Sequence, residues 1–350
     1  IIVTGTRRTD RTVADSPVPV DVLTSEDLTN SGSTETNRLL NQLVPSFNFP
    51  QPSLTDGTDS LRPATLRGLA PDQVLVLVNG KRRHQSSLIN LNGSVGRGST
   101  AVDMNTIPPL AIERIEVLRD GAASLYGSDA IAGVINVQLK KGIGGKAQAS
   151  YGKYVTEMED VGQVDTVGLT TGTADNPVIT YTGKDRKRRD GDTYTFASNF
   201  GLPLGESGYL NLTAEYKDRS ATNRSGADIR RNYFAAGDPR ETTFNRYAHR
   251  YGDGVSKDMN FFVNAGFDLS EAIEFYTFGS YGVRDGNGAG FYRRSSDVRN
   301  RDWAASTTTF IPIYADGFLP LIASEIIDVS AAAGLRGTMG SWDYDLSVVY

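Results

Sequence analysis

The feature that most constrains this chain is a set of long segments in which apolar and polar residues alternate. In residues 209–216, leucine, alanine and tyrosine occupy one face, while mostly amide, hydroxyl and carboxylate groups occupy the other. This period of two predicts a β-strand that is apolar on one side. Comparable alternation predicts seven strands, at residues 145–154, 191–202, 208–218, 257–268, 273–284, 325–338 and 342–350. Strands of about 9–11 residues with aromatic ends are typical of membrane-spanning barrels.

The links between these predicted strands alternate between long and short. The short links are residues 203–207, 269–272 and 339–341, and the long links are about 155–190, 219–256 and 285–324. Outer-membrane barrels have tight periplasmic turns and long extracellular loops, whereas a β-sandwich has no reason to alternate in this way. We therefore expect an antiparallel transmembrane β-barrel. The basic cluster Lys184–Arg189 falls in the first long link and predicts a solvated loop, with contact to anionic surface lipid or an acidic ligand as the alternative.

Residues 1 to about 140 have a different pattern, which is typical of a compact α+β domain. Strands are predicted near Val18–Leu23, Val74–Val78, Ile112–Leu118 and Val134–Leu139, and helical segments near Thr24–Leu28, Thr34–Leu43 and Gly121–Gly127. Pro45 ends the second helix because proline cannot continue it. Asn79-Gly80 predicts a tight turn, since both residues tolerate positive φ.

Composition excludes several classes of function. The absence of cysteine excludes disulfides, thiolate metal sites and a cysteine nucleophile. His84 and His249 are too few and too far apart for a convincing metal site. The net charge of −5 gives no support to nucleic-acid binding. The glycine-rich stretch 93–98 lacks the features of a nucleotide-binding loop, and no catalytic motif is present, so we expect neither an enzyme nor a cofactor.

Three stretches of this domain carry distinctive motifs: Leu66–Gly68 with Val74–Arg82 (LRG and VLVLVNGKR), Asn105–Pro108 with Ile112–Gly121 (NTIP and IERIEVLRDG), and Ser124–Val137 (SLYGSDAIAGVINV). Together they resemble the plug domain of TonB-dependent outer-membrane receptors. The resemblance implies a TonB box and plug domain at residues 1–142, followed by the N-terminal part of the barrel at 143–350. Family barrels close with about 22 strands. Because an open sheet edge is not viable in lipid, the seven predicted strands imply that the sequence is a fragment.

The resemblance also implies roles for residues at two places in the plug. Ile1, Ile2, Val3, Thr4 and Gly5 resemble the TonB box, which the inner-membrane partner TonB grips from the periplasm. An extended, β-branched stretch without proline suits strand addition to a partner, although an ordinary first strand of the plug is the alternative. Arg67 and Arg119 match two plug arginines that pair with glutamates on the barrel wall in this family; the alternative is that they only snorkel or cap local structure.

The function implied is active transport of a scarce solute across the outer membrane, with a ferric siderophore as the first expectation. Uptake of oligosaccharide, cobalamin or haem, or a signal-transducing receptor, are the alternatives; a passive porin or adhesin needs no plug. Candidate ligand contacts at the plug apex are Phe47, Phe49, Arg82, Arg83, His84, Gln85 and Arg97. Arginine and imidazole groups suit an anionic ferric siderophore, because charge-assisted hydrogen bonds are strong.

Overall fold

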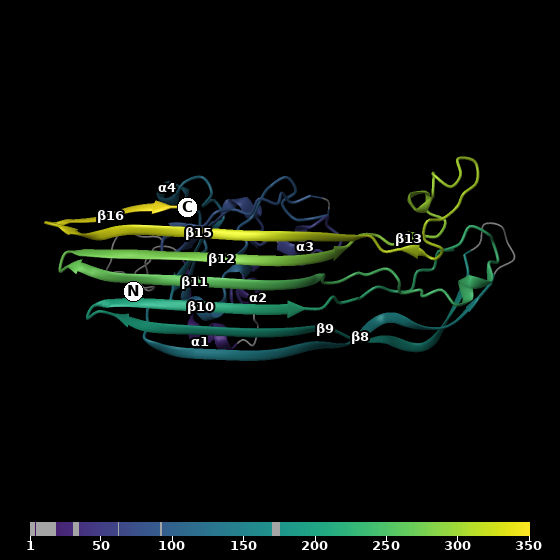
Figure 1. The fold of residues 1–350 in the computed structure, drawn as a ribbon, viewed down its shortest axis with the longest axis horizontal. Helices are drawn as coiled ribbons and strands as arrows, with labels where there is room; N and C mark the ends of the chain where they lie inside the picture. Colours follow the sequence, from purple (N-terminus) through teal and green to yellow (C-terminus); the bar gives the residue numbers. More distant parts are fainter. Residues whose placement is uncertain (1–3, 5–18, 31–34, 62, 92, 170–175) are drawn as a thin grey trace.

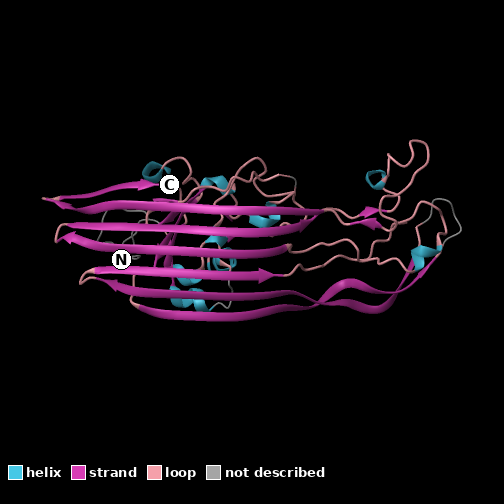
Figure 2. Cartoon of the chain, in the orientation of Figure 1, coloured by secondary structure: helices cyan, strands magenta, loops and turns pink. Residues whose placement is uncertain are grey.

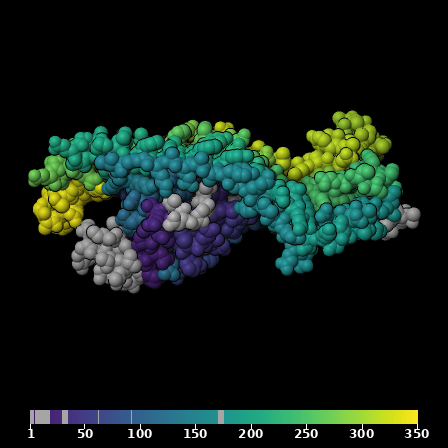
Figure 3. All heavy atoms as spheres, turned by 90° about the horizontal axis from the view of Figure 1, so that it is seen from below, coloured from purple at the N-terminus to yellow at the C-terminus, as the bar shows by residue number. Residues whose placement is uncertain are grey.

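The computed structural model describes residues 4, 19–30, 35–61, 63–91, 93–169 and 176–350 (Figure 1). A long antiparallel sheet covers one side of a smaller α+β domain, which we call the plug (Figures 1 and 3). The helices lie in the plug and in the loops, whereas the long sheet is made of strands and the turns that join them (Figure 2). No helix in the described part of the chain is long and apolar enough to cross a membrane.

The plug is built around a five-stranded sheet in the order β1-β6-β7-β4-β5. Its strands are β1 (Val20–Thr24), β4 (Val74–Val78), β5 (Lys81–Arg82), β6 (Ile112–Leu118) and β7 (Gly133–Leu139), with a separate pair formed by β2 (Phe47–Asn48) and β3 (Thr65–Leu66). Its helices are α1 (Ser25–Asn30), α2 (Thr36–Leu43), α3 (Thr58–Leu61) and α4 (Ala123–Tyr126). Short 3-10 helices lie at Pro71–Gln73, Met104–Thr106 and Pro109–Ala111.

Local sequence signals explain where these elements begin and turn. Thr24 and Asp27 cap α1 reciprocally: the Thr24 amide donates to Asp27 Oδ2 at 2.8 Å, and the Asp27 amide donates to Thr24 Oγ1 at 3.3 Å. The predicted turn after β4 is confirmed, since Asn79 and Gly80 have φ values of 48° and 79°. Positive φ at both positions matches the right-handed twist of the hairpin strands. The start of the second predicted helix, Thr34, lies outside the described residues.

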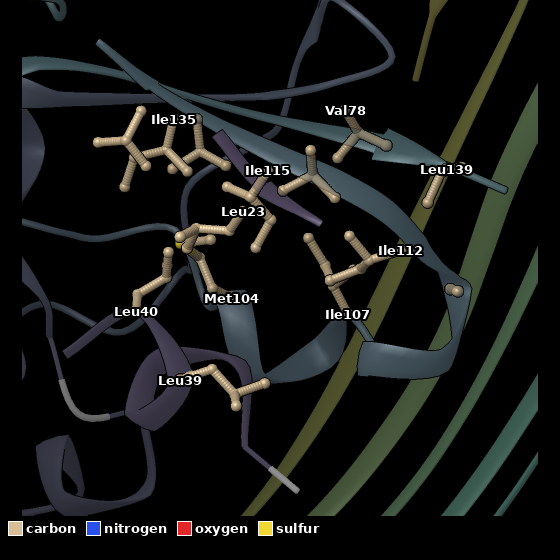
Figure 4. Close-up of a cluster of buried hydrophobic side chains, with 14 of the residues drawn as sticks. Leu23, Leu39, Leu40, Val78, Met104, Ile107, Ile112, Ile115, Ile135 and Leu139 are labelled. Atoms are coloured by element: carbon tan, nitrogen blue, oxygen red, sulfur yellow. The ribbon is translucent and has the colours of Figure 1, made fainter. Parts of the chain in front are cut away.

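Apolar side chains fill the space between the plug sheet and its helices (Figure 4). Leu39 and Leu40 of α2 face Ile112, Ile115 and Ile135 of the sheet, and all five are completely buried. Each such side chain contributes roughly 1.5–3 kcal/mol relative to exposure. The plug is therefore held together internally by ordinary hydrophobic packing.

The second sheet has seven strands in the order β16-β15-β12-β11-β10-β9-β8. They are β8 (Gly144–Gly168), β9 (Val178–Leu204), β10 (Gly208–Arg219), β11 (Val255–Ser270), β12 (Ile273–Ala289), β15 (Leu321–Met339) and β16 (Trp342–Val349). Between β12 and β15, a loop carries the short pair β13 (Arg293–Arg294) and β14 (Gly317–Phe318), and further 3-10 helices lie at Pro239–Thr242 and Val298–Asn300. Tight turns join the strands at one end and long loops at the other (Figure 1). The seven predicted strands are confirmed.

The first long link, however, is not the loop that the sequence predicts. β8 runs on to Gly168 and β9 begins at Val178, so most of residues 155–190 form an extension of the β8–β9 hairpin. The pairing register shifts between Gly152 and Tyr154, opposite Gly191 with φ of 72°. At this irregularity the side chains change the face to which they point. The period-two pattern is therefore interrupted in the sequence, and a prediction based on that pattern ends the strand too early. The prediction that Lys184–Arg189 is a loop is therefore wrong, because the cluster lies within β9.

The long sheet is inverted compared with the sheet of a soluble protein. On β10, the side chains of Asn211, Thr213 and Glu215 are buried, whereas those of Leu212 and Tyr216 on the other face are exposed. β11 repeats the arrangement. A sheet that exposes its apolar face and buries its polar face is suited to lipid outside and a polar lumen inside.

Candidate functional site

The plug meets the polar face of the long sheet through charged side chains. Arg83, which follows β5, is buried against β15, where its guanidinium pairs with Asp328. The same guanidinium donates to Ser280 Oγ of β12 at 2.8 Å. His84 Nε2 lies 2.8 Å from the other Asp328 oxygen. Burial lowers the pKa of Arg83, opposed by the nearby carboxylates.

A second contact centres on Arg284 of β12. Its guanidinium pairs with Asp103 of the plug and with Asp258 of the neighbouring strand β11, and all three side chains are buried. It also donates to the backbone oxygen of Ser60 in α3 at 3.1 Å. Arg284 therefore joins two barrel strands to two separate segments of the plug.

A third contact centres on Glu35, at the start of α2. Arg219 of β10 donates to its carboxylate at 2.6 Å, and Lys217 Nζ lies 3.9 Å from both Glu35 and Asp258. Arg38 pairs with Glu35 at 2.8 Å and with Asp253 at 3.2 Å. Burial opposes the charge of Arg38, but its acidic neighbours outweigh this effect and raise its pKa.

These charged side chains form one interface, which we call the ionic chain and define as Glu35, Lys217, Arg219, Asp258, Arg284, Asp103, Arg83 and Asp328. In a buried ion pair, the cost of desolvation offsets much of the attraction, so the net stabilisation is small. Removing one partner is much more unfavourable, because it leaves a buried charge without compensation. The ionic chain therefore fixes where the plug sits more than it adds to overall stability.

Sequence reasoning missed most of this interface. Glu215, Lys217 and Arg219 are charged residues at every second position on the polar face of one strand, and that spacing was a usable signal for a charged lumen. Their partners in the plug could not be found in this way. The ion pair between Arg83 and Asp328, for example, joins residues that are 245 positions apart.

The two predicted plug arginines bind carboxylates within the plug. Arg67 Nη1 lies 3.4 Å from Asp120, and both side chains are largely exposed. Arg119 Nε lies 2.7 Å from Asp21 of β1, although the contact lacks hydrogen-bond geometry. Pairing of Arg67 and Arg119 with barrel glutamates stays a prediction.

Three of the predicted ligand contacts require correction. Phe47 and Phe49 are each 4% exposed and belong to the plug core, because the segment after α2 turns its aromatic side chains inward. Arg83 belongs to the ionic chain and is likewise buried. None of these three side chains presents a free surface to a ligand.

The other four predicted ligand residues are exposed. Arg82 pairs with Asp129 and donates to the backbone oxygen of Tyr126, the last residue of α4. His84 contacts Asp328, and Gln85 accepts a hydrogen bond from Thr100. Arg97 lies in the glycine-rich stretch. These residues stay candidates for ligand contact.

Of the predicted TonB box, Ile1–Val3 and Gly5 lie outside the described residues, whereas Thr4 is described and completely buried. The Thr4 amide and hydroxyl donate to Glu116 Oε2 of β6 at 3.0 and 2.6 Å. Asn136 Nδ2 of β7 donates to the Thr4 hydroxyl oxygen at 3.0 Å.

The long loops on either side of β11–β12 fold against each other. Tyr233 donates to Asp316 Oδ1 at 2.6 Å, and the Ser296 amide donates to the backbone oxygen of Asn232 at 3.1 Å. In the second of these loops, the guanidinium of Arg299 donates hydrogen bonds to the Asp297 carboxylate and lowers the pKa of Asp297 to about 2.

In the part of the chain that the structure describes, no group of three or more His, Asp or Glu side chains could hold a metal ion.

Fold and interface together define a class of protein. Long strands bury a charged face and expose an apolar one, and a separate α+β domain packs on the charged face. This is the architecture of a membrane β-barrel with a plugged lumen.

Comparison with known proteins gives the family. The model of the TonB-dependent receptor plug domain family matches residues 12–134. Residues 12–134 belong to this plug domain family, and the chain comprises the plug together with antiparallel strands of a barrel.

Individual relatives are similar to part of the chain. The chain is 34% identical over 141 residues to the probable TonB-dependent siderophore receptor PirA of Acinetobacter baumannii, covering 40% of this chain and 18% of that relative. It is also 34% identical over 143 residues to the vitamin B12 transporter BtuB of Vibrio cholerae, covering 40% of this chain and 20% of the relative. These matches thus span about a fifth of each relative.

Solved structures extend the likeness to the strands. A mutant ferric enterobactin receptor of Pseudomonas aeruginosa, in complex with enterobactin, superposes with a TM-score of 0.56. The superposition covers 94% of this chain and 40% of that receptor, at 16% identity. At this identity, the comparison shows the fold alone.

Proposed function

We propose that the protein is an outer-membrane transporter that uses energy from TonB to take up a ferric siderophore. One observation carries the proposal: the plug is bound to the inner face of the strands through the ionic chain. A domain bound across the lumen blocks passive diffusion, so passage of a solute requires that the plug move. Movement of the plug requires these buried pairs to separate, and in this proposal TonB supplies the energy.

In this proposal, residues 1–142 are the TonB box and plug, and residues 143–350 are barrel strands whose long loops face outside. TonB binds the N-terminal segment by adding it as a strand. Arg82, His84, Gln85 and Arg97 contact the ligand, while Arg67 and Arg119 meet glutamates of the barrel wall. No bond in the ligand is made or broken.

A siderophore is preferred because several relatives are named for it. They include the ferrienterobactin receptor of Escherichia coli, which is 31% identical over 125 residues. A further relative, 35% identical over 130 residues, is named as an iron-regulated outer membrane virulence protein of Vibrio cholerae. Cobalamin is the second candidate, because a vitamin B12 transporter is as similar as the siderophore receptors. Each of these matches covers 40% of this chain or less, and in this proposal the long loops face the ligand.

Uptake by cells that express the full-length gene tests the proposal. We would measure surface binding and uptake of labelled ferric enterobactin in the wild type and in a Val3→Pro variant. Proline removes a strand hydrogen-bond donor, so uptake should stop while surface binding persists. Val13→Pro, further along the same N-terminal segment, is the matched control and should leave uptake intact.

Other outcomes would revise specific parts of the proposal. Unchanged uptake by Val3→Pro would show that the TonB box lies elsewhere. Uptake of labelled cobalamin, with no binding of any ferric siderophore in a panel of catecholates and hydroxamates, would replace iron with cobalamin as the cargo.

A further inference from the structure

Two long loops, which connect β10 to β11 and β12 to β15, meet at Tyr292 of the second loop. The Tyr292 ring is buried and packs against Phe244 of the first loop, with the ring centroids 5.9 Å apart. Its hydroxyl donates to the backbone oxygen of Asp316 at 2.6 Å. Its amide donates to Nδ1 of His249, in the first loop, at 3.2 Å. We call this contact between His249 and Tyr292 the loop joint.

The imidazole of His249 is partly buried and is held by neighbours from both loops. Its ring lies against Phe291 of the β12–β15 loop, with centroids 5.7 Å apart. Asn223 Nδ2, from its own loop, donates to the backbone oxygen of His249 at 3.0 Å. A ring nitrogen that accepts a hydrogen bond from a backbone amide carries no proton. The loop joint therefore requires the neutral imidazole, with its proton on Nε2.

Burial is the main influence on the charge of His249, and it lowers the pKa of the imidazole below the ordinary value of about 6.5. Two charged side chains of the same loop act on the ring in opposite directions: Asp228 favours the protonated form, and Arg230 opposes it. They pair with each other at 2.7 Å, so their effects on the ring largely cancel. The contacts from the β12–β15 loop, Phe291 and Tyr292, are uncharged.

We propose that His249 makes the pairing of the two loops sensitive to pH, joining them at neutral pH and releasing them when it is protonated. A protonated Nδ1 is a donor, so it and the Tyr292 amide would face each other without an acceptor. The separated loops bind the proton more readily than the joined loops, so acid favours separation. The loop joint is complete above a pH of about 6.5 and weakens as pH falls below it.

Other ionised contacts of the loops keep their charge over the same range of pH. Burial opposes the charge of Asp228, but hydrogen bonds from Arg230 outweigh burial and lower the pKa of Asp228. The pKa of Asp297 is about 2, as described above. The chain has two histidines, and the other one, His84, lies in the plug. We therefore assign a change of the loops between pH 8 and pH 5 to His249.

The distance between two spin labels reports whether the loops are joined. The chain has no cysteine, so Ala236→Cys and Ala305→Cys place one nitroxide at an exposed site of each loop; any cysteine elsewhere in the full-length receptor would be replaced. Pulsed electron paramagnetic resonance of the receptor in membranes would be recorded at pH 8 and pH 5. We expect one narrow distance distribution at pH 8. At pH 5, the ratio of separated to joined loops should rise roughly fivefold or more, as for loss of one hydrogen bond.

Two substitutions at His249 isolate its titration. In His249→Asn, the side-chain oxygen lies near the position of Nδ1 and accepts from the Tyr292 amide, but it does not titrate. This variant should keep the loops joined at both pH values. His249→Phe keeps a ring against Phe291 without an acceptor, so separated loops should be present already at pH 8. His84→Asn, at the other histidine, is the matched control and should respond to acid as the wild type does.

A distance distribution of the wild type that is the same at pH 8 and pH 5 would overturn the proposal. An acid response of His249→Asn equal to that of the wild type would also overturn it, because the titrating group would then lie elsewhere. The effect of the loop joint on ligand binding rests on the proposed function, whereas these distances need neither TonB nor ligand. A wild-type receptor that transports no ferric siderophore would therefore refute the proposed function alone.

Discussion

The interior of the plug and its boundary with the barrel are both buried, but they are built from opposite kinds of side chain. Inside the plug, Ile112, Ile115 and Ile135 are completely buried among other apolar residues. At the boundary, Arg83 and Arg284 are buried against carboxylates of the other unit. A smaller apolar contact, in which Phe262, Tyr276 and Phe278 of the barrel touch the plug core, accompanies the charged one.

This difference shows how one domain can be stable and yet displaceable. Apolar packing is lost only when the packed atoms separate, so it keeps the plug intact. Charged pairs bind strongly only in the correct geometry, and each partner can be solvated once water enters. We therefore expect the plug to detach from the barrel wall before its own core unfolds.

The largest effect is expected at Arg284. Arg284→Met would leave Asp103 without its arginine partner and Asp258 with the more distant Lys217, 3.9 Å away. It should weaken the attachment of the plug to the barrel by about 3–5 kcal/mol. Hydrogen exchange of amides in the segments of the plug that face the barrel, measured on the full-length receptor, reports this loss. Arg299→Met, which removes an arginine with 57% side-chain exposure, should have almost no effect on the plug. Equal effects of the two variants would contradict the importance of the ionic chain.

A somewhat smaller effect is expected from a cavity in the plug core. Ile135→Ala should destabilise the plug by roughly 2–4 kcal/mol, through lost apolar contact and the space left behind. The amides of β6 and β7 should lose protection, while those of β10–β12 keep theirs. Ile131→Ala, at a side chain that is 45% exposed, is the matched control. Loss of protection throughout the barrel strands would show that core and boundary are not separable.

Much of this architecture could be predicted from the sequence because it depends on local patterns. The alternation in residues 209–216 predicts the strand β10, and Asn79-Gly80 predicts the turn after β4. The buried run Val74–Val78 gives a strand of the plug sheet. Such signals need only neighbouring residues, so a single sequence contains them.

The boundary could not be predicted, because its contacts join residues far apart in the chain. The sequence alone predicts that Arg83 is an exposed ligand contact. Its burial depends on the ion pair with Asp328, which no local pattern indicates. Phe47 and Phe49 look like apical aromatics, since their inward direction depends on the plug sheet beneath them. Burial depends on the tertiary arrangement, and local propensity does not determine it.

The smallest effect is expected in the loops, away from both core and boundary. Asp297 has a pKa of about 2 because Arg299 donates hydrogen bonds to its carboxylate. Since the unfolded value is about 3.9, the contribution of this pair is complete above that pH and is lost as pH falls toward 2. Pepsin, which cleaves in this range, should cut the loop of Asp297→Asn roughly two- to fivefold faster than the wild type at pH 4. At pH 2 the two rates should converge; a constant ratio would contradict the assignment.

The most direct test of the central claim is a double-mutant cycle on Arg83 and Asp328. We would measure how strongly the plug is seated, from the exchange of its barrel-facing amides, in Arg83→Met, Asp328→Leu and the double variant of the full-length receptor. If paired charges hold the plug in place, each single change should cost about 3 kcal/mol or more, and the double variant should recover most of that loss. Single changes without effect, or losses that simply add, would contradict the claim that this ion pair seats the plug.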